Sequence, residues 1–268
     1  MKWIDTVMFN GEPIIKLRLL YLYNYVDTFY ITEQRYTHQG QKKEKLFIDI
    51  NNEWFTPYLD KVRFLVDETD YSNETNAWIA ENAQRNFSVQ TIVDDHKGTQ
   101  YICSVCDCDE IPNWSAVKQK TDLYDLSTNG AVIMIQKLFY YNLNWYLFDW
   151  KRAFFLNDKS IQRYMNFQLF REIDNQGPVT GSFDCGWHFS YFMEPADICR
   201  KIESFAHAEV NNPKYKTMEN VRNCIINGKI LYDYNYTLYR NTSMNFPNEI
   251  LQFHESLVAL QNMGFTYE

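Results

Sequence analysis

The stretch Gln100–Pro112 reads QYICSVCDCDEIP. Its first part, Gln100–Cys106, is apolar and alternates like a buried strand. The apolar run ends directly at three carboxylates within four positions, which belong to Asp107, Asp109 and Glu110. The sequence therefore predicts a core strand that delivers an acidic turn to its exposed carboxyl end.

This acidic turn has two interpretations. Three neighbouring acids repel one another, so we expect a cation to compensate them. Oxygen ligands suit Mn²⁺ or Mg²⁺, which often bridge a diphosphate through one or two protein carboxylates. The first interpretation is therefore a metal held by Asp107 and Asp109, which would neutralise charge on a departing diphosphate. The alternative is helix capping, with Asp109 or Glu110 stabilising a helix after Pro112.

Strand and helix patterns alternate before this turn. We expect strands at Trp3–Phe9, Asp27–Glu33 and Lys61–Val66, and helices at Ile14–Tyr25 and Thr75–Asp95. This β-α-β-α-β order predicts an α/β fold with a mostly parallel central sheet and helices on both faces. Ligands of such sheets bind at the carboxyl ends of the strands. Residues 33–40 and 107–112 are therefore the first places to look for a site.

The second half has a more antiparallel and aromatic-rich pattern. The expected elements are strands at Ala131–Ile135, Phe139–Tyr146 and Arg152–Phe155, a loop at Gly177–Gly181, and helices at Pro195–Phe205 and Lys216–Ile226. Neither a repeat nor a linker is visible. We therefore expect one domain with two functional halves, at about 1–112 and 113–235, and a C-terminal tail at 236–268.

Composition limits the possible functions. The chain has 268 residues, 46% of them hydrophobic and 17% aromatic, and a net charge of −8. It can bury a full core, but an acidic chain without a basic stripe is a poor nucleic-acid binder. No apolar run approaches the roughly 20 residues of a transmembrane segment, so we expect a cytoplasmic protein. Cys103 and Cys106 have C-x-x-C spacing without a second pair, which favours packed thiols over a zinc site.

Several segments together resemble glycosyltransferase family 17. In chain order they are VDTFYITE (26–33), THQG (37–40), WIAENAQR (78–85), CDCDEIP (106–112), GWHFS (186–190) and IESFAHAE (202–209). The resemblance runs from about residue 3 to 232, and it implies that the half at about 1–112 binds the nucleotide-sugar and that the half at 113–235 is the acceptor and catalytic half. It implies a GT-A-like fold and inverting transfer from a UDP-sugar, with UDP-N-acetylglucosamine as first choice. The family's Golgi members have a membrane anchor that is not seen here, so we expect a glycan or glycolipid acceptor other than an N-glycan.

The same resemblance suggests residues that contact the donor. Glu33 ends a strand where a GT-A-like fold meets the nucleoside, although it could equally be a solvated strand-end acid. His38 and Gly40 lie in the following loop, where glycine lets the backbone approach a ligand.

Further donor contacts are expected on the next helix and in the second half. Trp78 and Arg85 share one helical face with Glu81, so Arg85 either reaches a diphosphate or pairs with Glu81. Asp107 is expected to contact the donor as well as the metal. Trp187 stacks on a sugar or packs in the core.

The second half is expected to supply the remaining chemistry. His188 and His207 are the candidates to complete the metal site, because neutral imidazole is a competent ligand. Inversion needs a base for the acceptor hydroxyl. Asp184 and Glu209 are the candidate bases, with Glu203 behind them.

Two other functions are compatible with these residues. One is a carbohydrate-binding or scaffold protein that kept the fold and lost turnover. The other is a nucleotide-sugar hydrolase, which would use the same metal site with water as the acceptor.

Overall fold

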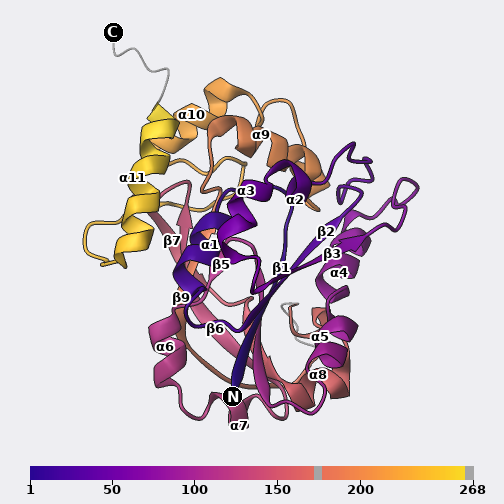
Figure 1. The fold of residues 1–268 in the computed structure, drawn as a ribbon. Coiled ribbons are helices and arrows are strands. Elements are labelled where there is room, and N and C mark those ends of the chain that lie inside the picture. Colours follow the sequence, from indigo (N-terminus) through magenta and orange to yellow (C-terminus); the bar gives the residue numbers. More distant parts are fainter. Residues whose placement is uncertain (172–176, 263–268) are drawn as a thin grey trace.

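The computed structural model of the chain describes residues 1–171 and 177–262. Within this part, a mixed sheet of ten strands runs through the molecule (Figure 1). Neighbouring strands follow the order β10-β7-β6-β8-β4-β1-β2-β3, and β9 pairs with β6 and β5. The strands are β1 (Lys2–Met8), β2 (Thr28–Gln34), β3 (Val62–Asp67), β4 (Tyr101–Asp107), β5 (Glu110–Ile111), β6 (Ala131–Tyr140), β7 (Trp145–Trp150), β8 (Phe154–Asn157), β9 (Val179–Ser190) and β10 (Tyr239–Arg240).

Helices cover this sheet and close its ends. The α-helices are α1 (Ile15–Leu22), α2 (Phe47–Ile50), α3 (Asn52–Phe55), α4 (Ala77–Asn86), α5 (Val89–Asp95), α6 (Trp114–Gln119), α7 (Leu123–Leu126), α8 (Asp158–Tyr164), α9 (Pro195–Ser204), α10 (Met218–Asn227) and α11 (Asn248–Asn262). The described residues also form three short 3-10 helices, η1 (Thr56–Tyr58), η2 (Gln168–Phe170) and η3 (Ala208–Val210). None of the helices in the described ranges has both the length and the apolar character that a membrane crossing requires.

The first half of the chain forms the parallel part of the sheet. β1 lies between β2 and β4, with Ile4 opposite Thr28 on one side and Cys103 on the other. β3 pairs in parallel with β2 at the outer side. Because all four strands are parallel, their carboxyl ends meet at one edge, which is where ligands of such sheets bind.

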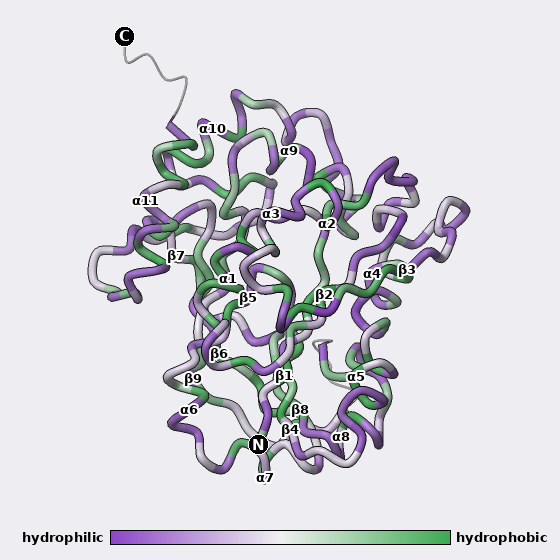
Figure 2. Tube along the Cα trace, viewed as in Figure 1, coloured by the Kyte–Doolittle hydropathy of each residue, from purple (hydrophilic) through white to green (hydrophobic). Residues whose placement is uncertain are grey.

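Side-chain alternation along the strands builds two core layers. On β1, Trp3 and Val7 pack on one face of the sheet, and Ile4 packs on the other. Helices α1 and α11 cover the face of Trp3, whereas α5 and α8 cover the face of Ile4. Hydrophobic residues accordingly concentrate along the central strands and α1, and the loops at the rim are mostly hydrophilic (Figure 2).

The second half extends the same sheet with a different pairing. β8 joins β4 in the antiparallel direction, and β6 continues antiparallel to β8. β9 runs parallel to β6 and antiparallel to the short β5, which places His188 opposite Glu110 and Trp187 opposite Ile111. A third core cluster packs beyond this region, where α9 and α10 cover residues of β6 and β7.

Gly186 shows why the Gly-Trp-His motif begins with glycine. Its φ is +99°, and a Cβ at this position would lie 2.1 Å from the carbonyl oxygen of Ile111. Only glycine accepts both the backbone angle and the close approach of β5 to β9. The motif residue therefore fixes the strand pairing that brings His188 to the acidic turn.

These elements confirm the predicted fold class, an α/β fold with a large central sheet between helices. The strands predicted for the first half and the helix predicted at Ile14–Tyr25 lie within three residues of the observed ends, whereas α2 and α3 were not predicted. One difference is the expected helix Thr75–Asp95, which is two helices with a break at Phe87 and Ser88. The Oγ atom of Ser88 lies 2.8 Å from that of Thr6, so a buried contact to β1 accompanies the break.

The second half differs more from the prediction. The expected strand Phe139–Tyr146 is the end of β6, a turn and the start of β7, and Tyr141 in that turn has a φ of +67°. The expected loop Gly177–Gly181 instead enters β9 at Val179. The tail at 236–268 contains β10 and α11, and its last six residues lie outside the described part.

Candidate functional site

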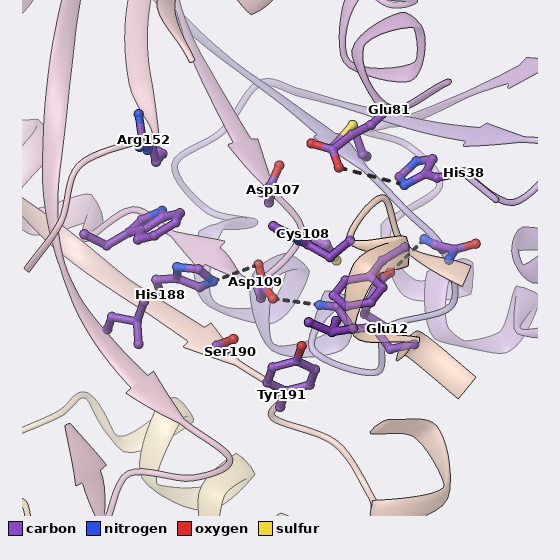
Figure 3. A pocket seen from close by; sticks show the side chains of 18 of the residues that line it. Glu12, His38, Glu81, Asp107, Cys108, Asp109, Arg152, His188, Ser190 and Tyr191 are labelled. Carbon is purple, nitrogen blue, oxygen red and sulfur yellow. Dashed lines mark hydrogen bonds and ion pairs between the residues drawn. The ribbon is translucent and has the colours of Figure 1, made fainter. Parts of the chain in front are cut away.

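A cavity of about 850 Å³ opens at the carboxyl ends of β1 and β4. The first half lines it with residues that follow β1, with the face of α4 and with the acidic turn. The second half contributes residues of β6, β7, β9 and α9 and the segment before β10. Figure 3 shows Asp107 and Asp109 inside this group, with His188 on one side. Strand order thus places the acidic turn where ligands of parallel sheets bind.

Asp107 is held by two guanidinium groups. Its Oδ1 lies 2.6 Å from Nη1 of Arg85, and its Oδ2 accepts from Nη2 of Arg171. Burial alone would raise the pKa of the Asp107 carboxyl, but the charges of Arg171 and Arg85 outweigh burial and hold this pKa below its usual range. Asp107 therefore carries a negative charge that is held in place between the guanidinium groups of Arg85 and Arg171.

Glu110 contacts both Asp107 and Arg171 and so helps to hold this ion pair in place. Its Oε2 accepts from the Asp107 backbone N–H at 2.6 Å and from Nη1 of Arg171 at 2.7 Å. Its Oε1 accepts from the Trp150 indole N–H. The capping alternative is wrong, because the helix after the turn is capped by Asn113, whose Oδ1 accepts from the Ser115 N–H at 3.0 Å.

Asp109 faces the second half of the chain. Its Oδ2 lies 3.1 Å from Nζ of Lys201 on α9, and its Oδ1 lies 3.4 Å from Nε2 of His188 on β9. Burial would raise the pKa of the Asp109 carboxyl, but Lys201 and His188 outweigh it and hold this pKa well below its usual range. In turn, Asp109 overcomes the effect of burial on Lys201 and raises the pKa of that ammonium.

The predicted metal ligands do not form one coordination set in this arrangement. Each carboxylate oxygen of Asp107 and Asp109 already faces a guanidinium, an ammonium or an imidazole. His207 instead directs Nδ1 to Glu209, at 2.7 Å from its Oε1. Among residues 1–171 and 177–262, no three His, Cys, Asp or Glu side chains gather as a metal site. The residues as placed fit a network of ion pairs.

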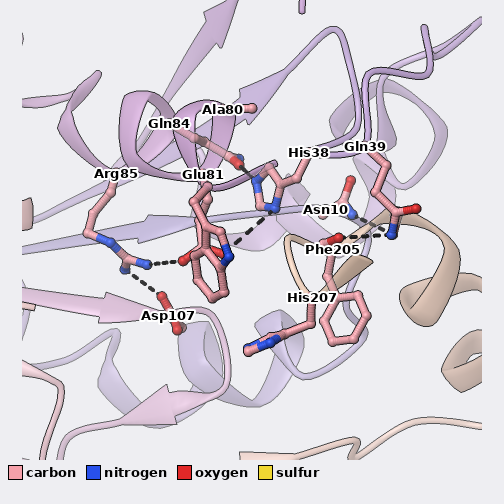
Figure 4. Close-up of polar contacts among 12 residues, drawn as sticks. Asn10, His38, Gln39, Ala80, Glu81, Gln84, Arg85, Asp107, Phe205 and His207 are labelled. Atoms are coloured by element: carbon pink, nitrogen blue, oxygen red, sulfur yellow. Dashed lines mark hydrogen bonds and ion pairs between the residues drawn. The ribbon is translucent and has the colours of Figure 1, made fainter. Parts of the chain in front are cut away.

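His38 belongs to a polar cluster on the α4 side of the cavity (Figure 4). Its Nε2 lies 2.7 Å from Oε1 of Gln84, and its Nδ1 lies 4.0 Å from Oε2 of Glu81. Burial lowers the pKa of the His38 imidazole. The other carboxylate oxygen of Glu81 accepts from Arg85 at 2.8 Å, so the predicted helical pair Glu81–Arg85 is present.

Arg85 lies behind the cavity wall, outside the lining residues. Its three guanidinium nitrogens donate to Glu81, Asp107 and Gln168. Arg85 therefore fixes the orientation of the Asp107 carboxylate relative to α4.

Trp78 and His207 meet across the opening of the cavity. Trp78 lies in the first turn of α4, whose N-cap Asn76 accepts from the Trp78 backbone N–H. The Trp78 and His207 rings lie edge to face with centroids 4.7 Å apart. Both residues line the cavity, and one comes from each half of the chain.

The remaining predicted donor contacts lie outside the lining. Glu33 is fully buried, where it accepts from Lys43 and from the backbone N–H groups of Phe47 and Ile48 at the start of α2. Gly40, with a φ of +78°, closes a tight turn against the carbonyl of Tyr71.

Three second-half candidates are also outside the lining residues. Trp187 is buried and packs between Tyr21 and Phe189, as the core interpretation predicted. Asp184 is exposed on β9. Glu209 is exposed at η3, where it pairs with the lining residue His207.

Sequence reasoning did not identify three cationic residues of the cavity, Arg152, Arg171 and Lys201. Lys201 was detectable, since it directly precedes the family-like segment 202–209. Arg171 and Arg152 occupy no motif, and the structure alone brings Arg171 to Asp107 and Glu110 and Arg152 to the cavity lining. The aromatic residues Phe148, Tyr232, Tyr234 and Tyr236 of the lining were likewise not identified.

The sequence of this chain matches one known protein family. Glycosyltransferase family 17 matches residues 1–245 of the chain. No curated protein matches it. Among solved structures, the chain is similar to the crystal structure of S. aureus TarS 1-349, with a TM-score of 0.32 and 14% identity, over 52% of this chain and 36% of that one. A similarity this distant carries no information about activity or substrate.

Proposed function

Because the chain belongs to glycosyltransferase family 17, we propose that it transfers a sugar from a nucleotide-sugar donor to a hydroxyl of a glycan or glycolipid acceptor. The proposed donor is a UDP-sugar, with UDP-N-acetylglucosamine as first choice, and transfer inverts the anomeric carbon. The observation that supports this most is the position of Asp107 and Asp109. They lie at the carboxyl end of a central strand, in a cavity that aromatic side chains of the second half also line.

The cavity has two chemically different sides. Residues after β1 and on α4, including Asn10 and Trp78, supply polar and aromatic groups suited to a nucleoside. Arg171 and Lys201 supply positive charge beside the acidic turn, and Arg152 supplies a further cation in the same cavity. We place the donor diphosphate near these cations, because fixed positive charge stabilises a leaving group that becomes more negative in the transition state.

In the proposed reaction, the acceptor oxygen attacks the anomeric carbon as the bond from that carbon to the diphosphate oxygen breaks. The hydroxyl proton passes to a base on the side opposite the leaving group. The earlier candidates Asp184 and Glu209 do not line the cavity. Within residues 1–171 and 177–262, four carboxylates line it, namely those of Glu12, Glu81, Asp107 and Asp109.

We propose Glu12 or Glu81 as this base. The depressed pKa values of the two aspartates make them weak bases at neutral pH. Removal of the base is expected to lower turnover by about 10²–10⁴-fold with donor affinity nearly unchanged. Glu12→Gln and Glu81→Gln test this, with exposed Asp122→Asn as control. Parent turnover in both glutamine variants would show that the base is elsewhere, and Asp184→Asn and Glu209→Gln would be measured next.

The predicted Mn²⁺ or Mg²⁺ is a separate proposal, and no step above depends on it. The ion would have to displace Lys201 or His188 from Asp109. Mn²⁺ alone is therefore expected to bind more weakly than Mn²⁺ together with UDP. Calorimetric titration of MnCl₂ with and without UDP measures both affinities. An absence of binding heat in both titrations would remove the ion from the proposal.

The function itself is tested by following UDP release and sugar products together. Purified protein is incubated with UDP-N-acetylglucosamine, with and without a library of acceptor glycans, and the products are identified by mass spectrometry. Glycosylated product formed only with acceptor is the expected result. Free sugar in equal amounts without acceptor would indicate the hydrolase, and no turnover with any UDP-sugar would indicate the binding protein.

A further inference from the structure

We propose that an aromatic wall of the cavity binds the acceptor as a neutral oligosaccharide chain, whose sugar rings stack along it. This inference rests on the proposed glycosyl transfer and names the acceptor class. The aromatic wall consists of Trp150, Phe148, Tyr236, Tyr234 and Tyr232, and all five side chains line the cavity.

The rings of the aromatic wall form a continuous row. Phe148 stacks on Trp150 at 6.4 Å between centroids and contacts Tyr236 at 5.7 Å. Tyr236 contacts Tyr234 at 6.2 Å, and Tyr234 contacts Tyr232 at 5.6 Å. A row of this kind offers repeated apolar surfaces, as a chain of similar rings requires.

The row begins beside the acidic turn. Trp150 meets His188 edge to face at 4.8 Å, and His188 in turn contacts Asp109. The Trp150 indole N–H is also fixed by Glu110. A chain lying on the aromatic wall would therefore present its terminal sugar to the acidic turn.

The outer part of the row is open to solvent. Tyr234 and Tyr236 are 46% and 56% exposed, whereas Tyr232 is 7% exposed. The three tyrosines occupy alternate positions of one segment, separated by Asp233 and Asn235. Core packing accounts for Tyr232 but not for its two neighbours.

The chemistry of this exposed part suits a carbohydrate. Tyrosine offers a rigid apolar ring and a hydroxyl at little cost in side-chain entropy, which matches a ligand with apolar ring faces and many hydroxyls. The nearby charge of Asp233 is already paired with Lys214 and Tyr215. A neutral, polar ligand fits this surface better than an apolar helix or a charged lipid headgroup.

A glycan array tests the inference directly. Labelled wild-type protein, the double variant Tyr234→Ala/Tyr236→Ala and the control Tyr239→Ala are applied to printed neutral pyranose glycans of one to six sugars. Tyr239 is a suitable control because it is 60% exposed on β10 but lies outside the cavity lining. We expect wild type and control to bind the same glycans, and the double variant to bind them at least about tenfold more weakly.

The length of the ligand and the donor give two further readouts. With the glycan that binds best, wild-type affinity should rise from the monosaccharide to the longer forms, and the double variant should lose that rise. UDP binding should be equal in all three proteins. No glycan binding by wild type, or equal weakening in Tyr239→Ala, would overturn the inference. If UDP binding is absent in wild type, the proposed function fails instead.

Discussion

Arg18 lies beneath the acidic turn with a side chain that is 0% exposed, as is that of its partner Asp5. Two of its nitrogens donate to the two Asp5 oxygens, each at 2.7 Å. The third donates to the backbone carbonyl oxygens of Glu110, at 2.6 Å, and Asp107, at 3.3 Å. A buried ion pair below the turn thus positions its backbone, and the side chains above follow.

Removal of Arg18 should therefore destabilise the whole protein. Arg18→Met leaves Asp5 as an unpaired buried charge, which costs about 3–5 kcal/mol in the free energy of unfolding. Urea unfolding measures this loss of stability. Asp5→Asn/Arg18→Met should recover part of the loss, because it removes both charges. Arg200→Met, in an exposed pair with Asp197, should change stability by less than about 0.5 kcal/mol. Similar losses of stability in Arg18→Met and Arg200→Met would contradict this account.

Asp109 gives the stability a defined pH dependence. Its folded-state pKa lies well below the unfolded value, so protons bind the unfolded chain more readily. The stabilisation by its ion pairs is fully present above about pH 5 and is lost as pH falls from about 4 toward the lower folded-state pKa.

This pH dependence can be measured as the difference in the free energy of unfolding between wild type and Asp109→Asn. The stability advantage of wild type over Asp109→Asn should be constant from about pH 5 to 7 and should shrink from about pH 4 to 2. Urea unfolding at each pH measures both. A difference that stays unchanged down to pH 2 would show that Lys201 and His188 do not stabilise the ionised Asp109.

At the scale of elements, the pairing of β5 with β9 connects the acidic turn to the second half. Gly186 permits it, because its missing Cβ leaves room for the carbonyl of Ile111. The motif containing Gly186 was recognised in the sequence, but its partner was not. β5 has only two residues, Glu110 and Ile111, and a strand this short has no pattern of its own.

Gly186→Ala should separate β5 from β9. The substitution combines a strained φ with a backbone clash, so we expect a loss of about 3 kcal/mol or more in the free energy of unfolding. Gly98→Ala is a matched control, because Gly98 also has a positive φ, +75°, but nothing lies within 4 Å of its added Cβ. The control should lose only about 1–2 kcal/mol. Equal losses would show that strain alone matters.

The two halves of the sheet were not equally predictable. β1, β2 and β4 are buried strands with a largely apolar first part, and helical patterns separate them, so local pattern suffices for them. β9 carries polar and exposed residues over much of its length, and its pairing with β6 shifts register twice. Its strand character comes from partners distant in sequence, which a local pattern does not reveal.

At the scale of the whole molecule, the end of α9 is attached to the loops of the first half. The Ser204 carbonyl accepts from the His38 backbone N–H at 3.1 Å, and the Ser204 hydroxyl accepts from the Asn10 amide at 3.0 Å. The Gln39 amide donates to the carbonyl oxygens of Ile202 and Phe205. The acidic turn and His188 were predictable as parts of one site because motifs mark them. Lys201 reaches Asp109 through this packing of α9, so the contact between Lys201 and Asp109 was not predictable from the sequence.

Because both halves line the cavity, a donor bound there should stabilise the molecule as one unit. A ligand at a hundredfold excess over its dissociation constant adds about 2.7 kcal/mol to the free energy of unfolding. For a chain of this size, that corresponds to a rise of roughly 5–10 °C in melting temperature. We expect UDP and UDP-N-acetylglucosamine, with Mn²⁺ present, to raise the melting temperature in a single transition.

Two comparisons make this melting experiment decisive for the donor. GDP and GDP-mannose at equal concentration should give a much smaller rise, because we propose a UDP-sugar as the donor. Asp109→Asn should lose most of the rise with UDP, since Asp109 lies in the cavity where the diphosphate is proposed to bind. Asp122→Asn, exposed and remote from the lining residues, should keep it. A rise with the GDP compounds and none with the UDP compounds would show that the donor is wrong. A full rise in Asp109→Asn would instead place the diphosphate away from the acidic turn while leaving the donor itself unchanged.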